Sequence, residues 1–252
     1  MRVNESLKKH ILWDDDAIVI DTSASQGSWL VDKETGKTYL DCFSQFASQP
    51  LGWNHPKVLG RKDELVKVAI HKIANSDMAT TEFAEFVDTF SKIAPDFRYH
   101  FFIDGGALGV ENALKAAFDW KAQKAGLPST AMNVIYLREA FHGRTGYTMS
   151  MTNSPHSSLK VKWYPKFNWT KIRNPKLKYP LDEVAIRNSE AIALEEMERA
   201  LAKKNVAAVI YEPIQGEGGD NHFRKEFFVA TRELANRYEA MFILDEVQTG
   251  VG

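Results

Sequence analysis

The stretch that decides the fold is VAAVIYEPIQGEGGDNHFRKEFFVATRELANRYEAMFILDEVQTG, residues 206–250. It begins with a continuous apolar run closed by Glu212 and ends with a second run closed by Asp245. Apolar runs of this length are typical of strands that are buried on both faces, as in a parallel sheet. Between them the sequence predicts a glycine-rich loop and a helix over residues 225–238. This strand, loop, helix and strand predict an α/β protein.

The two acids stand where open α/β sheets bind ligands, at the carboxyl ends of strands. A lone acid in that position can simply face solvent. Here further polar and glycine residues lie close by in the sequence, namely Gln215, Glu217, Gly218, Gly219 and Gln248. We therefore interpret this end of the sheet as a ligand site.

The motifs EPIQGEGGD (212–220) and FILDEVQTG (242–250) resemble the class III, or ω-amino, aminotransferases, which use pyridoxal 5′-phosphate. The resemblance covers nearly the whole chain, from residue 21 onward. Within that class, FIDGGALGVENALKAAFDWK (102–121) is most similar to lysine ε-aminotransferase. The resemblance implies an α/β fold of type I among the pyridoxal-phosphate-dependent transferases, with a mostly parallel sheet in the large domain.

By this resemblance, residues 1–60 are the N-terminal segment that joins the small domain, and residues 61–252 are the large cofactor-binding domain, incomplete at its C-terminus. The sequence predicts a small antiparallel hairpin within residues 28–41, with Gly36 supplying the positive φ that such a turn needs. An irregular stretch follows. The family places Gln45 to Gln49 at the substrate side of the active site, and a plain connecting loop is the alternative.

Two helices are predicted next, one starting just after Pro56 and one starting at an N-cap threonine, Thr80 or Thr81. In the second helix an apolar stripe at helical spacing predicts a buried face, made by Phe83, Phe86, Val87 and Phe90. HFFID at residues 100–104 is predicted to be a strand, and the helix that follows it has an apolar face from Val110 to Phe118.

Gly105 and Gly106 precede that helix, and the exposed N–H groups of a helix N-terminus favour an anion such as phosphate. The resemblance implies that residues matching Gly106 and Ala107 bind the cofactor phosphate. The Walker pattern is absent, and the dinucleotide fingerprint is not matched.

The strand MNVIYL (132–137) leads to FHGR (141–144). By resemblance, Phe141 stacks on the cofactor ring and Arg144 receives a substrate carboxylate, which suits a flat ring and a planar guanidinium. His142 is interpreted as a hydrogen-bonded structural histidine. From Ala140 to Leu181 there is no acid, while lysines alternate with aromatic residues. A groove for single-stranded nucleic acid is one reading, but the neutral overall charge favours a long surface loop.

The resemblance also assigns roles at the ligand site. Asp245 is the expected catalytic residue, which holds the protonated ring nitrogen of the cofactor. Glu212 helps to position the cofactor, and Gln248 contacts its phenolic oxygen and the substrate side. Glu217 is a substrate-binding acid that pairs with a distal arginine and releases it when a dicarboxylate keto acid arrives.

The implied activity moves the terminal amino group of L-lysine to 2-oxoglutarate through pyridoxal phosphate and gives 2-aminoadipate semialdehyde and glutamate. Another ω-amino acid donor, 4-aminobutyrate or ornithine, is the alternative within the class. A non-catalytic scaffold that kept the fold for binding or dimerisation is the alternative outside it.

Composition agrees with a cytoplasmic protein. The formal charge of −1 gives no general attraction to nucleic acid or to acidic membranes. Cys42, the single cysteine, excludes an internal disulfide and a cysteine-cluster metal site, and it is expected in the core. The N-terminus lacks the apolar run of a signal peptide, and no run approaches the ~20 apolar residues of a membrane span. The resemblance implies a homodimer at full length.

In this family the lysine that forms the Schiff base lies beyond the DEVQTG motif, and this sequence ends at Val251–Gly252. The resemblance therefore implies the N-terminal part of an aminotransferase without its covalent anchor. We expect residues 1–252 alone to fold poorly and to be inactive, because HFFID would lack its neighbouring strands.

Overall fold

The computed structural model describes residues 3–13, 17–71, 77–128 and 131–250. The chain forms two compact units, which we call unit 1 (residues 1–101 with 251–252) and unit 2 (residues 102–250). The boundary after residue 60, which the family resemblance implies between the small-domain segment and the large domain, stays a prediction.

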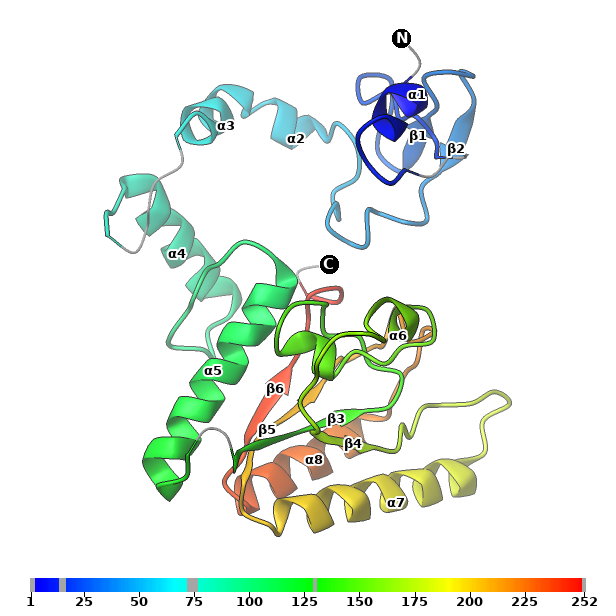
Figure 1. The fold of residues 1–252 in the computed structure, drawn as a ribbon. Coiled ribbons are helices and arrows are strands. Elements are labelled where there is room, and N and C mark those ends of the chain that lie inside the picture. The colour runs from blue at the N-terminus through cyan, green and yellow to red at the C-terminus, as the bar shows by residue number, and fades with distance from the viewer. Residues whose placement is uncertain (1–2, 14–16, 72–76, 129–130, 251–252) are drawn as a thin grey trace. The chain divides into compact units, whose positions relative to one another are not determined.

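Unit 2 is built on a parallel sheet. Its strands lie in the order β4-β3-β5-β6, and every neighbouring pair is parallel (Figure 1). The bounds are Asn133–Leu137 for β3, Thr170–Ile172 for β4, Val206–Tyr211 for β5 and Met241–Leu244 for β6. All residues of β5 are buried, as the continuous apolar run predicts. The same prediction is wrong for β6, in which no residue is buried, because β6 is the last strand in the order of this sheet. The α/β fold expected from the sequence is therefore confirmed.

Side chains that alternate along the strands supply two separate cores. Ile135 and Leu137 belong to the cluster that packs against α7 (Glu183–Leu201) and α8 (Lys225–Arg237). Val134 and Tyr136 belong to the cluster that packs against α5 (Gly106–Ala125). Because successive strand side chains point to opposite faces, helices cover both faces of the sheet (Figure 1).

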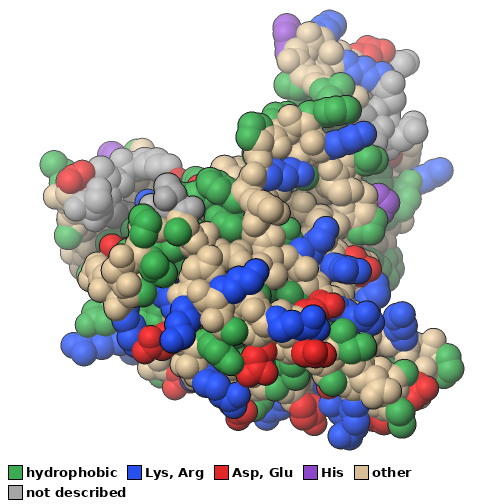
Figure 2. Space-filling model, turned by 60° about the horizontal axis from the view of Figure 1, so that its bottom comes forward, with side chains coloured by type: hydrophobic (Ala, Val, Ile, Leu, Met, Phe, Trp, Pro, Cys, Tyr) green, Lys and Arg blue, Asp and Glu red, His purple; other side chains and the backbone are tan. Residues whose placement is uncertain are grey.

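The ends of these helices follow from local chemistry. Asp182 caps α7 by accepting from the N–H groups of Val184 and Ala185. α5 begins after Gly105 and ends at Gly126, both with positive φ (97° and 64°). The side of the molecule that carries α7 in Figure 1 comes forward in Figure 2, where basic and acidic side chains are interspersed.

The interpretation of residues 140–181 as a long surface loop is wrong in part. The segment contains β4, a short helix η2 (Thr148–Ser150) and α6 (Ser157–Lys160). Met151, Val161 and Trp169 within it are buried. A three-residue strand between prolines carries too little pattern to be recognised, and pairing with β3 is what defines it.

Unit 1 contains shorter elements. They are α1 (Val3–Lys8), β1 (Trp29–Val31), β2 (Thr38–Leu40), α2 (Pro56–Leu59), α3 (Lys62–Ala69) and α4 (Thr81–Ile93). The predicted hairpin is confirmed, since β1 and β2 are antiparallel and Gly36 has φ 69°. The helix expected after Pro56 is divided in two near Gly60, and its last predicted residues, 72–75, lie outside the described ranges. Thr80 is the N-cap of α4 and accepts from the N–H of Phe83.

Three expectations for this region are wrong. No residue of α4 is buried, and the rings of Phe83, Phe86 and Phe90 contact one another along the helix. Residues 100–104 contain no strand, because none of the four strands of the sheet pairs with them. Cys42 is exposed, since it lies in the irregular segment after β2.

That irregular segment contains a left-handed turn. Four consecutive residues, Ser44 to Ala47, have φ between 48° and 64°. A residue other than glycine in this conformation costs roughly 1–2 kcal/mol, because its Cβ approaches the following carbonyl oxygen. The carboxylate of Asp41 accepts from the N–H groups of Phe43 and Ser44 and so anchors the start of the turn. Whether Gln45 to Gln49 line a substrate site stays a prediction.

In the part of the chain that the structure describes, no helix has the length and apolar character needed to cross a bilayer. The cytoplasmic location expected from the sequence stays a prediction.

Candidate active site

The predicted site residues in unit 2 come from four segments that meet at the carboxyl ends of the strands. The segments are the start of α5, the loop after β3, the loop after β5 and the turn after β6. Because β3, β5 and β6 are neighbours in the sheet, the residues that follow them are brought to the same edge.

The turn after β6 and the loop after β3 are joined by a buried pair. Nδ1 of His142 lies 2.7 Å from Oδ2 of Asp245, and both side chains are almost fully buried. Oδ1 of Asp245 accepts from the N–H of Val247 at 3.2 Å, which fixes the second carboxylate oxygen. The other ring nitrogen of His142, Nε2, is buried without a hydrogen-bond partner among the described residues. The pair therefore holds a carboxylate in a fixed direction away from water.

Glu212 joins the loops after β3 and β5. Its Oε1 accepts from the N–H of Phe141 at 2.9 Å, and its side chain is buried. The pKa of Glu212 is raised to about 7, first by burial and also by the neighbouring charges of Asp245 and Glu217, while His142 and the Phe141 N–H oppose the shift. Glu212 therefore takes up a proton near neutral pH.

Two glycines bring the start of α5 against these loops. A Cβ on Gly143 would lie 2.6 Å from Cβ of Ala107, and Gly143 has φ 114°. A Cβ on Gly106 would lie 2.4 Å from a methyl group of Val247. A side chain at either glycine would push the helix N-terminus away from the site. The close approach explains why glycine is required in both positions.

Thr152 fixes the loop after β3 from the other side. Its hydroxyl accepts from the N–H of His142 at 3.1 Å and donates to the carbonyl of Gly143 at 2.6 Å. Sequence reasoning missed Thr152, and it interpreted His142 as structural only. His142 is hydrogen-bonded as expected, but its partner is the predicted catalytic acid. The available signal for a role of His142 in the site was its position after β3, a strand that neighbours β5.

The remaining predicted residues lie at the rim. Gln248 is exposed, and a Cβ on Gly216 would lie 2.3 Å from its amide oxygen Oε1. Arg144 is exposed, with no carboxylate of the described residues at ion-pair distance. Glu217 is half-buried and accepts from the hydroxyl of Ser157 at 2.8 Å.

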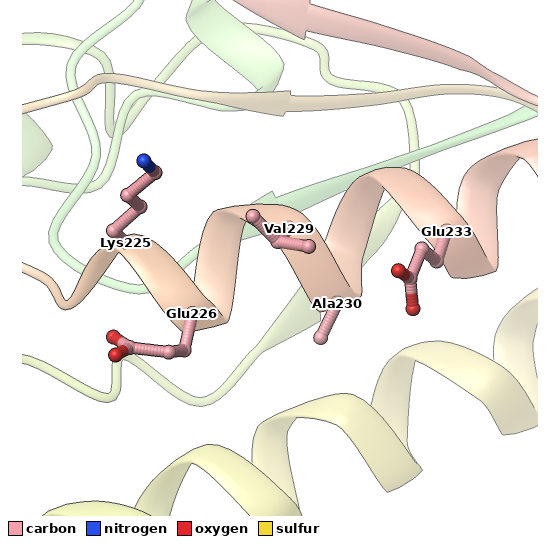
Figure 3. A pocket seen from close by; sticks show the side chains of 5 residues that line it. All are labelled: Lys225, Glu226, Val229, Ala230 and Glu233. Carbon is pink, nitrogen blue, oxygen red and sulfur yellow. The ribbon is translucent and has the colours of Figure 1, made fainter.

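A hollow of about 340 Å³ lies elsewhere, along α8, and its lining residues are Lys225, Glu226, Val229, Ala230 and Glu233 (Figure 3). All of them belong to one helix, and none is a predicted site residue. We therefore do not assign it to the candidate active site.

Residues 13–252 match the sequence profile described as aminotransferase class-III. The chain belongs to the class III aminotransferases. This membership confirms the family resemblance that the two motifs of unit 2 indicate.

Individual relatives agree with the membership. The chain is 49% identical over 265 residues to the L-lysine-epsilon aminotransferase of Amycolatopsis lactamdurans, covering 99% of this chain and 58% of that protein. The L-lysine-epsilon aminotransferase of Streptomyces clavuligerus is 48% identical, with 99% and 57% covered. The structure superposes on lysine aminotransferase from M. tuberculosis with a TM-score of 0.93 at 45% identity, covering 100% of this chain and 60% of that one.

These matches confirm the fold of type I pyridoxal-phosphate-dependent transferases. The chain spans less than two thirds of the length of these relatives.

Proposed function

We propose that this chain forms the cofactor-binding part of a lysine ε-aminotransferase. The reaction moves the terminal amino group of L-lysine to 2-oxoglutarate and gives 2-aminoadipate semialdehyde and glutamate. The observation that carries the proposal is the buried pair of His142 and Asp245 at the carboxyl ends of neighbouring strands. The donor is inferred from relatives named L-lysine-epsilon aminotransferase at 46–49% identity, whereas those named 4-aminobutyrate aminotransferase are 32–34% identical.

The residues present fit pyridoxal phosphate. A pyridine nitrogen needs a carboxylate that stays charged and oriented, and Asp245 is buried and fixed through both of its oxygens. A phosphate needs backbone N–H groups at a helix start, and the glycine contacts at Gly106 and Gly143 bring the start of α5 to the site. When bound, pyridoxal phosphate supplies the electron-accepting ring and the carbonyl carbon that carries the amino group.

The chain would hold this group through residues from all four segments. Gly106 and Ala107 bind the phosphate, and the ring of Phe141 stacks on the pyridine. Asp245 keeps the ring nitrogen protonated, and His142 orients Asp245 and shields it from water. Glu212 accepts from the N–H of Phe141 and so positions the loop that carries Phe141. Gln248 contacts the phenolic oxygen of the cofactor.

Substrate binding would use the rim. Arg144 is exposed and available to pair with a substrate carboxylate in bidentate fashion. Glu217 would attract the cationic donor and release its distal arginine partner for a dicarboxylate. We further propose that the working enzyme is a homodimer.

The test is Asp245→Ala in the protein expressed from its complete natural reading frame. Loss of the buried carboxylate should lower transamination of lysine by at least ~10³-fold, since a neutral partner does not hold the pyridinium charge. Asp245→Asn should behave alike. Glu246→Gln changes the adjacent, exposed acid and serves as the matched control, with turnover within about twofold of the unmodified protein.

Each alternative has its own signature in the same assay. Near-normal turnover by Asp245→Ala would remove Asp245 from this role. Faster turnover with 4-aminobutyrate or ornithine than with lysine would assign the enzyme to another donor. Cofactor binding without turnover of any of these donors would favour a scaffold.

A further inference from the structure

The loop between β5 and α8 is a closed turn with Glu217 near its tip. Gln215 and Asn221 exchange two backbone hydrogen bonds of 3.1 Å across its base. The carbonyl of Gly216 accepts from the N–H of Gly219 at 3.0 Å, which tightens the turn. The backbone path of the loop is therefore fixed, although the loop is rich in glycine.

The backbone on either side of Glu217 also rests on other loops. A Cβ on Gly216 would lie 2.3 Å from the amide oxygen of Gln248, and a Cβ on Gly218 would lie 2.4 Å from the carbonyl of Glu139. With both neighbours held, the main freedom left to Glu217 is the direction of its side chain. The group that contacts the Glu217 carboxylate therefore determines the position of its negative charge.

The contact is a buried hydroxyl. Oγ of Ser157, the first residue of α6, donates to Oε1 of Glu217 at 2.8 Å, and Ser157 is 1% exposed. Over the described ranges, no lysine, arginine or histidine nitrogen lies within ion-pair distance of Glu217. Hydrogen bonds to a charged acceptor are stronger than neutral ones. The hydroxyl is therefore well suited to orient this carboxylate.

Glu217 lies beside the candidate active site, since a Cβ on its neighbour Gly216 would lie 2.3 Å from the amide oxygen of Gln248. Burial raises the pKa of Glu212, and the charges of Asp245 and Glu217 act in the same direction. Glu212 in turn accepts from the N–H of Phe141. The hydroxyl of Ser157 therefore holds a negative charge at the rim of the site where the substrate is expected.

We propose that Ser157 is a positioning residue that holds Glu217 toward the active site and so favours a cationic amino donor over a dicarboxylate acceptor. A carboxylate attracts an ammonium group and repels a second carboxylate, most strongly where water is excluded. Without the hydroxyl, the side chain of Glu217 loses the hydrogen bond that the described residues give it. The inference rests on the proposed function, since it concerns lysine and 2-oxoglutarate.

The experiment measures both half-reactions of the protein from its complete natural reading frame. In Ser157→Ala, kcat/KM for L-lysine should fall by about 3- to 10-fold, the effect of losing one hydrogen bond of typical strength. The value for 2-oxoglutarate should stay the same or rise. Ser157→Thr keeps a hydroxyl and should restore the lysine value. Ser158→Ala is the matched control, since the hydroxyl of Ser158 donates to the carbonyl of Pro155, outside the site.

An equal fall in both half-reactions, or no change in either, would overturn the inference. A protein that does not turn over lysine refutes the proposed function instead, and the contact is then decided by carbon NMR of the same protein from its complete natural reading frame. A carboxyl resonance of Glu217 that moves in Ser157→Ala but not in Ser158→Ala supports the contact. A resonance that stays in place in both variants refutes it.

Discussion

Unit 2 and unit 1 differ in how much of their apolar surface the chain itself covers. In unit 2, β5 is buried throughout, and Phe227 of α8 is 1% exposed. In unit 1, Leu30 is the one hydrophobic side chain that is buried among the described residues, and α3 and α4 contain no buried residue. The candidate active site therefore lies in the unit whose geometry is maintained by contacts within the chain.

The largest effect expected from this difference is on stability. Phe227→Ala removes a ring that stacks on Tyr211 with centroids 5.6 Å apart, and it should lower the free energy of unfolding by ~3–5 kcal/mol. Phe86→Ala changes a ring that is 48% exposed in α4 and should cost no more than ~1 kcal/mol. Guanidinium unfolding followed by tryptophan fluorescence measures both.

Similar losses in the two variants would contradict the comparison, because they would mean that α4 is covered as fully as α8. Aggregation of the unmodified chain would instead agree with the expectation that residues 1–252 fold poorly alone. That expectation stays a prediction, and light scattering during the same titration tests it.

The two units also differ in how far the sequence predicts them. The runs that form β5 and β6 are continuous and apolar, so strand type, parallel pairing and the position of the acids follow from pattern alone. The stripe of α4 is just as regular, yet its pattern does not say whether another element covers it. Periodicity predicts which face is apolar, and burial depends on tertiary contacts that no local pattern contains.

The sequence predicts which segments form the site, but it does not predict which side chains contact one another there. Glu212 and Asp245 are recognisable because each closes a strand. The partner of Asp245 is His142, which is 103 positions away in the sequence, and the partner of Glu217 is Ser157, which is 60 positions away. Such pairings arise from the crossovers of the sheet, so they become visible only when the strand order is known.

A second test uses pH on unit 2. The pKa of Glu212 is raised from 4.5 to about 7, so the folded state binds its proton more tightly than the unfolded state does. Its stabilising contribution is fully present below pH 4.5 and is lost as the pH rises toward 7. Relative to Glu212→Gln, the free energy of unfolding should fall by about 3 kcal/mol across this window. A parallel pH dependence of the two proteins would contradict this.

In unit 1, Asp41 should give a pH dependence of stability with the opposite sign. Hydrogen bonds from the N–H groups of Ser44 and Phe43 lower the pKa of Asp41 below 3.8. Its contribution is present above that value and is lost as the pH falls further. Asp41→Asn should therefore weaken the acid dependence of unit 1, measured by the amide exchange of Phe43 and Ser44, and leave the dependence of Glu212 in place.

The smallest effect expected is at the left-handed turn of unit 1. Ala47 is exposed and has φ 64°, so Ala47→Gly removes the clash of Cβ with the backbone. The greater freedom of glycine in the unfolded chain offsets part of this gain, which leaves a net stabilisation of roughly 0.5–1 kcal/mol. Ala84→Gly makes the same change within α4, where it should destabilise by ~1 kcal/mol. Opposite signs in denaturant unfolding would show that backbone conformation, not side-chain burial, governs this unit. If Ala47→Gly destabilises as much as Ala84→Gly does, the turn is not left-handed in solution.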